Sequence, residues 1–251
     1  MLNAALKVVN QNPLGSAAGY GSSFPINRTF TTQELGFATL KFNSVAAQMS
    51  RGKSEKTVAF AMSSVAATLA KFSMDVCLYM SQNFDFISLP AHLTTGSSIM
   101  PHKKNPDVFE LIRGKCNKIQ ALPYEITLIT NNLPSGYHRE FQLLKEGLFP
   151  AIQNLKACLD IAIFSIKDIK VKDNILADPK YNYLFTVDTL NEMVVAGMPF
   201  RDAYKAVAEQ LENGTYESPK ATQHTHEGSI NNLCLKEIKE KMQNAFYLIF
   251  D

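Results

Sequence analysis

The sequence has little of what marks several classes of protein. It has no long run of like charge: 25 lysines and arginines face 23 acidic residues, for a net charge of +2. That balance argues against a nucleic-acid-binding surface and against a polybasic membrane tether. The start of the sequence also shows no signal-peptide pattern. We therefore expect a cytoplasmic protein that binds neither nucleic acid nor membrane.

Cysteine is scarce, and the four cysteines form no CxxC pair. They are Cys77, Cys116, Cys158 and Cys234, each in a stretch with a helical pattern. Scattered cysteines of this kind indicate buried free thiols in a reducing compartment rather than a disulfide framework.

Strand signals are nearly missing, because no stretch keeps a period-two alternation between turn residues. Helical patterns dominate instead, beginning with a capped segment whose N-cap is Thr31 or Thr32. Longer helices are predicted over residues 54–82, 105–131 and 138–170. Three long helices with short connections predict an all-α fold built as a helical bundle.

The most apolar window, Val58 to Met80, is long enough to span a membrane. It contains Lys71 and Asp75, and four serines and threonines lie within it. Charges at bilayer depth are costly, so we interpret this segment as a buried core helix.

The helices shorten after residue 170, to about 187–196, 200–212 and 233–250. We therefore predict two domains: a bundle over residues 1–170 and a small helical domain over 171–251. The first ten residues, "MLNAALKVVN", resemble the tail of a helix without a start signal, so we expect the bundle domain to be truncated at its N-terminus. Residues 11–31 are predicted to be a long loop.

The stretch "TTGSSIMPHKKNPDVFE", residues 94–110, carries the strongest chemical signal. Asn105 as N-cap and Pro106 as first helical residue predict a helix start there. The loop before it would then present small hydroxyls, Lys103 and Lys104 beside a helix N-terminus, which favours anions. This pattern predicts a carboxylate or phosphate ligand; the alternative is a basic, flexible surface loop.

"GSSIMPHKKNP" closely resembles the signature loop of the fumarase/aspartase lyase superfamily. Two further stretches, "NPLGSAAGYGSSFPINR" and "LPSGYHREFQLLKE", are similar to segments of the argininosuccinate lyases within it, as are "GMPFRDAY" and "HTHEGSINNL". The resemblance covers the whole chain in order. The sequence departs from many relatives after Asn43, where "NSVAAQMSRGKSEK" replaces an acid-rich stretch.

The resemblance implies a role for each matching residue. Ser97 matches the general base that removes the substrate's Cβ proton, Lys103 the lysine that stabilises the resulting aci-carboxylate, and Glu110 a carboxylate that supports a catalytic histidine. The implied substrate-binding residues are Asn105, Tyr137, Gln142, Lys145 and Arg28, and Ser16 lies in a matching turn.

Elementary chemistry agrees with the first two roles. β-Elimination next to a carboxylate adds negative charge to it in the transition state, and fixed cations stabilise that charge. A serine acts as a base only where cations and a helix dipole stabilise its alkoxide, and this loop offers both. If a helix begins near His138, Gln142 and Lys145 would also share one of its faces.

The resemblance implies a carbon–nitrogen lyase, an argininosuccinate lyase, that splits argininosuccinate into arginine and fumarate without a cofactor. It implies a homotetramer whose sites combine three subunits. The family's catalytic histidine would precede Met1, so we expect the isolated chain to be nearly inactive. Alternatives are a sibling lyase of the adenylosuccinate, aspartate or malate type, or a non-catalytic scaffold. The "HTHEGS" stretch lacks helical metal spacing, which favours a capping or packing role.

Overall fold

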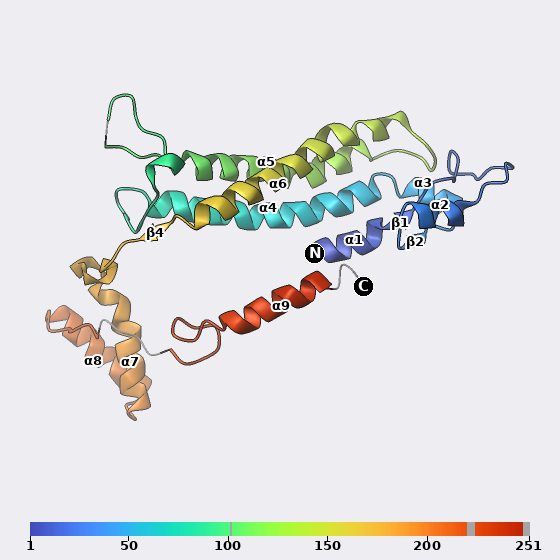
Figure 1. Ribbon diagram of the computed structural model, residues 1–251. Helices are drawn as coiled ribbons and strands as arrows, with labels where there is room; N and C mark the ends of the chain where they lie inside the picture. The colour runs from blue at the N-terminus through green and yellow to red at the C-terminus, as the bar shows by residue number, and fades with distance from the viewer. Residues whose placement is uncertain (101, 220–223, 248–251) are drawn as a thin grey trace. The chain divides into compact units, whose positions relative to one another are not determined.

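The computed structural model describes residues 1–100, 102–219 and 224–247. Within these residues most of the chain is helical, and the strands are only two residues long. The three long helices are α4 (Lys53–Tyr79), α5 (Asp107–Ile129) and α6 (Leu144–Ile166), which lie side by side in Figure 1. This architecture confirms the predicted all-α bundle.

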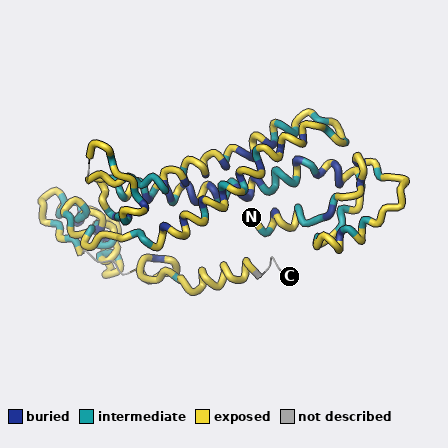
Figure 2. The backbone as a smooth tube through the Cα atoms, turned by 45° about the horizontal axis from the view of Figure 1, so that its top comes forward, coloured by how far each residue is buried: buried dark blue, intermediate teal, exposed yellow. Residues whose placement is uncertain are grey.

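A regular apolar spacing explains why these helices pack together. On α6 the buried positions are separated by four and three residues: Leu144, Leu148, Ala151, Leu155, Cys158 and Ala162. That spacing puts these buried side chains on one face. The faces of the three helices meet around Phe109, which is fully buried and lies edge-to-face against Phe72 with ring centroids 5.9 Å apart. Figure 2 shows the buried positions concentrated along these helices.

Short elements precede the bundle: α1 (Leu2–Val9), β1 (Gln11–Asn12), α2 (Arg28–Glu34), β2 (Thr39–Leu40) and α3 (Ser44–Met49). Strands β1 and β2 pair in parallel. The predicted cap at Thr31 or Thr32 is wrong. The cap is Asn27, whose side chain accepts a hydrogen bond from the Phe30 N–H at 2.9 Å. The predicted loop therefore ends earlier, and the helical run after it is two helices separated by β2.

The segment predicted as one helix over 138–170 is also divided. A 3₁₀ turn, η2 (Arg139–Gln142), comes first, and α6 begins at Leu144. Gln142 and Lys145 therefore belong to different elements, and the prediction that they share a helical face is wrong. Phe141 is buried, and its carbonyl accepts a hydrogen bond from Arg51 at 3.1 Å, which ties the turn to the start of α4.

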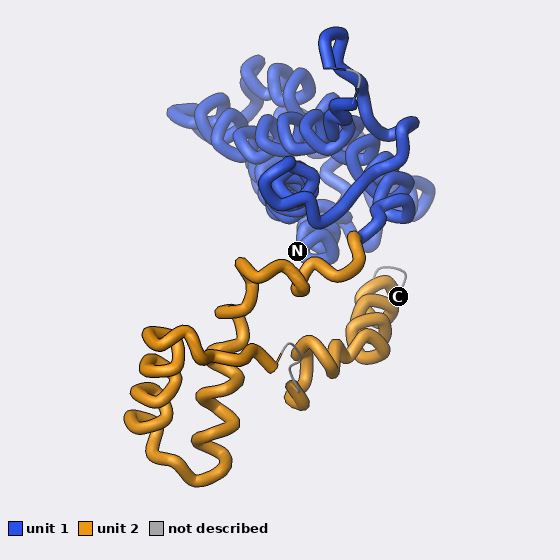
Figure 3. The backbone as a smooth tube through the Cα atoms, turned by 90° about the vertical axis from the view of Figure 1, so that its left-hand side faces the viewer, with its two compact units in different colours: residues 1–171, 248–251 blue, residues 172–247 orange. Residues whose placement is uncertain are grey.

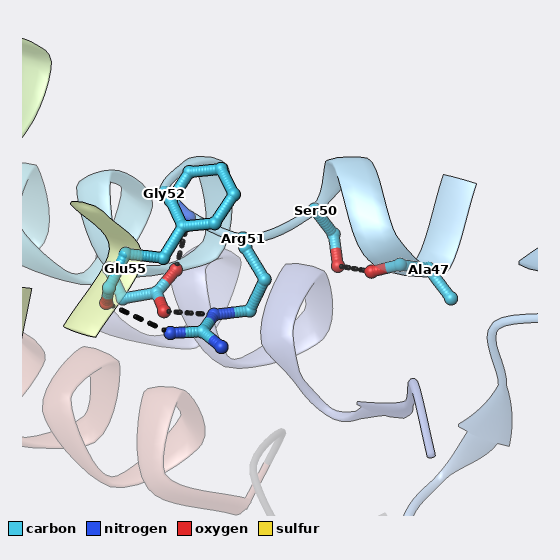
Figure 4. Close-up of polar contacts among 6 residues, drawn as sticks. Ala47, Ser50, Arg51, Gly52 and Glu55 are labelled. Atoms are coloured by element: carbon cyan, nitrogen blue, oxygen red, sulfur yellow. Dashed lines mark hydrogen bonds and ion pairs between the residues drawn. The ribbon is translucent and has the colours of Figure 1, made fainter. Parts of the chain in front are cut away.

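The start of α4 is fixed by a compact set of polar contacts (Figure 4). The Glu55 carboxylate accepts a hydrogen bond from the Gly52 N–H at 2.7 Å and pairs with Arg51 at 3.1 Å. Gly52 has φ +75°, and a Cβ there would lie 2.4 Å from Thr130 Cγ2 at the end of α5. The first turn of α4 and the last turn of α5 are thus in close contact.

Gly52→Ala is expected to lower the free energy of unfolding by about 2–4 kcal/mol, because it adds a steric clash to a left-handed backbone. Gly36→Ala is the matched control, since Gly36 has φ +68° but no atom within 4 Å of the added Cβ. It should cost only about 1 kcal/mol. Urea denaturation of both variants measures the difference, and equal losses would contradict the close contact.

The four cysteines are all free. Cys116 and Cys158 are buried between α5 and α6. Burial raises the pKa of the Cys116 thiol to about 12, and the neighbouring Cys158 adds to the rise. This thiol therefore stays protonated at neutral pH, as expected of a core residue. Cys234 differs from the prediction: it lies just before a helix, half-buried, with φ +54°.

The chain divides into two compact units, residues 1–171 and 172–247 (Figure 3). In the first, η1 (Ala91–Leu93) follows β3 (Ile87–Ser88), which pairs with β4 (Lys170–Val171). The second contains η3 (Ile175–Ala177), η4 (Pro179–Phe185), α7 (Thr186–Val195), α8 (Phe200–Glu212) and α9 (Leu235–Tyr247). The last part of the helix predicted over 233–250, residues 248–250, lies outside the described residues. The domain boundary at residue 170 stays a prediction, because compactness does not show independent folding.

Two segments, Lys53–Tyr79 and Arg139–Ile166, are long and apolar enough to cross a membrane by length and composition alone. Core helices of bundles have the same property. In α4 the buried side chains face the other long helices, which agrees with its interpretation as a core helix.

Candidate active site

The signature loop lies at the N-terminal end of α5. Ser97 is half-buried, and its Oγ accepts hydrogen bonds from the backbone N–H groups of Ile99 at 3.3 Å and Met100 at 3.2 Å. Hydrogen bonds donated to an oxygen stabilise its anionic form. The loop therefore folds so that its own backbone supports charge on the proposed base.

Asn105 does not cap α5, contrary to the prediction. The N-cap position is Pro106, without a side-chain hydrogen bond. Asn105 instead forms a single antiparallel bridge with Thr95, which closes the base of the loop. From sequence alone, a polar residue before a helix predicts a cap. Here α5 begins two residues after Asn105, and the backbone of Asn105 pairs with Thr95 across the loop.

Lys103 and Glu110 lie on either side of the start of α5, and both are exposed. Glu110 belongs to the first turn of the helix, near Cys77 of α4 and Arg113. Burial raises the pKa of the Cys77 thiol; Arg113 opposes this rise and Glu110 adds to it. Ser97, Lys103, Asn105 and Glu110 thus gather at one end of the bundle.

A second group of site residues follows the C-terminal end of α5. The Gln142 Nε2 donates a hydrogen bond to Tyr137 Oη at 3.2 Å, which brings two of the predicted substrate-binding residues together. Lys145 is exposed in the first turn of α6. The N-terminal loop joins this group, because Tyr20 Oη donates to the Ser135 carbonyl at 3.4 Å.

Arg28 acts as a structural clamp in this structure. Its guanidinium donates to three backbone carbonyls, those of Leu14 at 2.8 Å, Lys41 at 2.8 Å and Phe42 at 2.9 Å. Ser16 is buried, and its carbonyl accepts hydrogen bonds from two glycine N–H groups. Three of the five Arg28 donors are occupied, so contact with a substrate is left to the other two.

The two groups of site residues lie at opposite ends of α5 (Figure 1). The helix has 23 residues, and at 1.5 Å per residue it separates them by about 34 Å. No small dicarboxylate could touch both groups of one chain. A site that uses both must draw them from different copies.

A cavity of about 350 Å³ adjoins the second group. It is lined by Met49, Arg51, Lys53, Lys56, Thr130, Leu133, Pro134, Ser135, Gly136 and Phe141. Arg51 is already paired with Glu55. In the part of the chain that the structure describes, neither Lys53 nor Lys56 lies within 4.0 Å of a carboxylate oxygen. The cavity is therefore positively charged and suits an anion.

Sequence reasoning missed several of these residues. Lys53 and Lys56 could have been found from the sequence. Cations in the first turn of a helix are unfavourable beside the helix dipole, so their presence there suggests a role other than stabilising the helix. Thr95 gave none, since its partner is only evident once the loop is folded. In "HTHEGS", His224 Nε2 lies 2.9 Å from Asp188 Oδ1 and its ring stacks on His226. The capping or packing role of this stretch stays a prediction; among the described residues no group of three metal-binding side chains lies together.

Comparison with known sequences shows what this chain is similar to. Residues 1–121 match the lyase family. The chain is 57% identical over 245 residues to an argininosuccinate lyase of Parabacteroides distasonis, which covers 98% of this chain and 55% of the relative. It is also 57% identical over 244 residues to an argininosuccinate lyase of Bacteroides fragilis, a match that covers 97% of this chain and 55% of the relative. An argininosuccinate lyase of Xanthomonas campestris is 41% identical over 206 residues, covering 82% and 48%.

Solved structures share the fold. A class II fumarase from Schistosoma mansoni superposes with a TM-score of 0.70 at 18% identity, covering 95% of this chain and 53% of that one. An EDDS lyase in complex with formate superposes with a TM-score of 0.67 at 24% identity, and the match covers 85% of this chain and 43% of that one. The chain thus matches the lyase family model over residues 1–121, is similar to argininosuccinate lyases over nearly all of its own length, and spans about half the length of those relatives.

Proposed function

We propose that this chain forms part of an argininosuccinate lyase of arginine biosynthesis, which splits argininosuccinate into arginine and fumarate. The observation that carries the proposal is the Ser97 loop at the start of α5, in a chain 57% identical to argininosuccinate lyases over 98% of its length. The fold alone would fit any fumarate-releasing sibling.

In the proposed mechanism Ser97 Oγ removes a proton from the substrate's Cβ. The electron pair left on that carbon moves into the adjacent carboxylate, and Lys103 with Asn105 stabilises this charge. The pair then returns to form the double bond of fumarate as the Cα–N bond breaks, and the nitrogen leaves with arginine. Glu110 is assigned to support the protonating histidine, which would come from outside this chain.

Tyr137, Gln142 and Lys145 are assigned to substrate binding. The hydrogen bond between Gln142 and Tyr137 holds two of these polar groups in one orientation, and Lys145 offers a positive charge to a carboxylate. Arg28 keeps this assignment in a weaker form, since most of its donors hold backbone carbonyls. The positively charged cavity beside Ser135 is consistent with a substrate rich in carboxylates.

The separation of the two groups along α5 supports a homo-oligomer, and the resemblance favours a cytoplasmic homotetramer. Large apolar side chains are exposed on all three long helices: Phe60, Leu111, Tyr124, Leu128, Phe149, Ile161, Ile163 and Phe164. Exposed apolar surface on this scale marks an interaction surface. We expect copies of this chain to cover it.

Leu128→Asp is expected to shift the protein to a smaller species in light scattering, because a charge would enter the apolar interface. Leu128 is 55% exposed on α5. Val195→Asp is the matched control: Val195 is 89% exposed and belongs to the second unit, not to the three long helices. A stable monomer of the unmodified chain at micromolar concentration would contradict the proposed assembly.

The activity is tested in a chimera, in which this sequence replaces the 245 matching residues of the Parabacteroides distasonis relative. Fumarate release from argininosuccinate, followed by absorbance, is the expected result. Adenylosuccinate, aspartate and malate are the comparison substrates, and the 251-residue chain alone is expected to be nearly inactive. Release from a sibling substrate only would contradict the assignment to argininosuccinate, and a folded but inactive chimera would favour a scaffold.

A further inference from the structure

The base of the signature loop is held by one backbone bridge. Asn105 N–H donates to the Thr95 carbonyl at 2.8 Å, and Thr95 N–H donates to the Asn105 carbonyl at 3.2 Å. Residues 96–104 extend beyond this bridge. We call the paired residues Thr95 and Asn105 the neck of the loop.

The Thr95 side chain connects the neck to α5. Its hydroxyl donates a hydrogen bond to Oδ2 of Asp107, in the first turn of the helix. That turn is firmly packed, because Phe109 within it and Ile112 just after it are buried in the bundle core. A hydrogen bond to a carboxylate is stronger and more directional than one between neutral groups. Asp107 thus links the loop to a helix that is packed in the bundle core.

The remainder of the loop has no comparable attachment. The Ser97 hydroxyl accepts from Ile99 and Met100, and Lys103 N–H donates to the Met100 carbonyl at 3.0 Å. These bonds are all internal. For the loop residues that the structure describes, 96–100 and 102–104, no hydrogen bond reaches the bundle. The neck therefore determines where the loop emerges and where Ser97, two residues beyond Thr95, is placed.

We infer that Thr95 and Asp107 are positioning residues that hold the Ser97 loop in register with α5 for the elimination reaction. This inference rests on the proposed function for its catalytic part. Neither residue is needed to touch the substrate. Misplacing a catalytic group by about 1 Å can cost about 100-fold in rate, so the neck should act on kcat and leave KM nearly unchanged.

Four variants separate the hydrogen bond from other effects. Thr95→Val keeps the shape and removes the donor, while Thr95→Ser keeps the donor. Asp107→Asn keeps an acceptor oxygen and removes the charge. Thr94→Val is the matched control, because the Thr94 hydroxyl lies 3.4 Å from the Pro90 and Ala91 carbonyls and does not contact Asp107. Circular dichroism checks that each variant is folded.

The first measurement uses the 251-residue chain itself. Amide hydrogen exchange of Thr95 and Asn105 at millisecond-to-second labelling times should become about five- to tenfold faster in Thr95→Val. Thr95→Ser should stay within about twofold of the unmodified chain, with Asp107→Asn in between. Thr94→Val should not change the exchange. Unchanged exchange in Thr95→Val would overturn the inference.

The second measurement is steady-state turnover in the chimera. Thr95→Val should lower kcat about 10- to 100-fold with KM within about twofold, and Thr95→Ser should restore most of the rate. A raised KM with unchanged kcat would overturn the positioning role, since it would indicate direct substrate contact. A chimera inactive even without these substitutions overturns the proposed function and the catalytic part of this inference. The exchange result still decides whether Thr95 and Asp107 hold the neck.

Discussion

Replacing Ser97 by alanine in the chimera is expected to lower kcat by about 1,000-fold, within the range that a positioned general base contributes. KM should change little, because a base acts on the transition state rather than on the bound ground state. Two backbone N–H groups already point at the Ser97 oxygen, so the structure offers that oxygen a partner for negative charge.

Ser98→Ala is the control for this prediction. Ser98 is the exposed neighbour of Ser97, and no catalytic role is assigned to it. Its replacement should leave kcat within about threefold, the scatter expected for an exposed residue that makes no essential contact. Near-normal turnover of Ser97→Ala would remove Ser97 from the role of base, and an equal loss in both variants would indicate damage to the whole loop.

Mixing two impaired variants of the chimera is expected to restore part of the activity. Ser97→Ala damages one group of site residues, and Lys145→Ala damages the other by weakening substrate binding. The groups lie at opposite ends of the 23-residue helix α5, so a site that uses both would combine groups from different copies. In an oligomer assembled at random from equal amounts, about a quarter of the sites carry two intact groups.

The experiment unfolds the two variants together, refolds them and compares fumarate release with that of each variant treated alone. Recovery of about a quarter of the unmodified rate is the expected outcome. A chimera carrying both substitutions in one chain, mixed with unmodified chimera, controls for the refolding yield. No recovery from the two single variants, with recovered activity in the control mixture, would contradict a site shared between copies.

Some of the loop could be anticipated from sequence and some could not. The residues "GSSIMPHKKNP" predicted a loop before a helix start, and α5 begins within two residues of the predicted position. The hydrogen bond between Thr95 and Asp107 was not predictable, because twelve residues separate its partners. Only the folded loop brings them together. The same holds for Gln142 and Tyr137, which meet because a 3₁₀ turn precedes α6 where the pattern predicted continuous helix.

The sequence by itself determined the class of fold and the places of two of the three long helices, α4 and α5. Apolar residues repeating at separations of three and four specify a helix and its buried face wherever they occur, because that periodicity is local. The signature motif is local in the same sense. Tertiary structure alone decided which polar groups meet: Asn105 with Thr95, Arg28 with three backbone carbonyls, and the two groups of site residues at opposite ends of α5. Those contacts depend on how far apart the packed helices hold distant segments, and no local pattern encodes that distance.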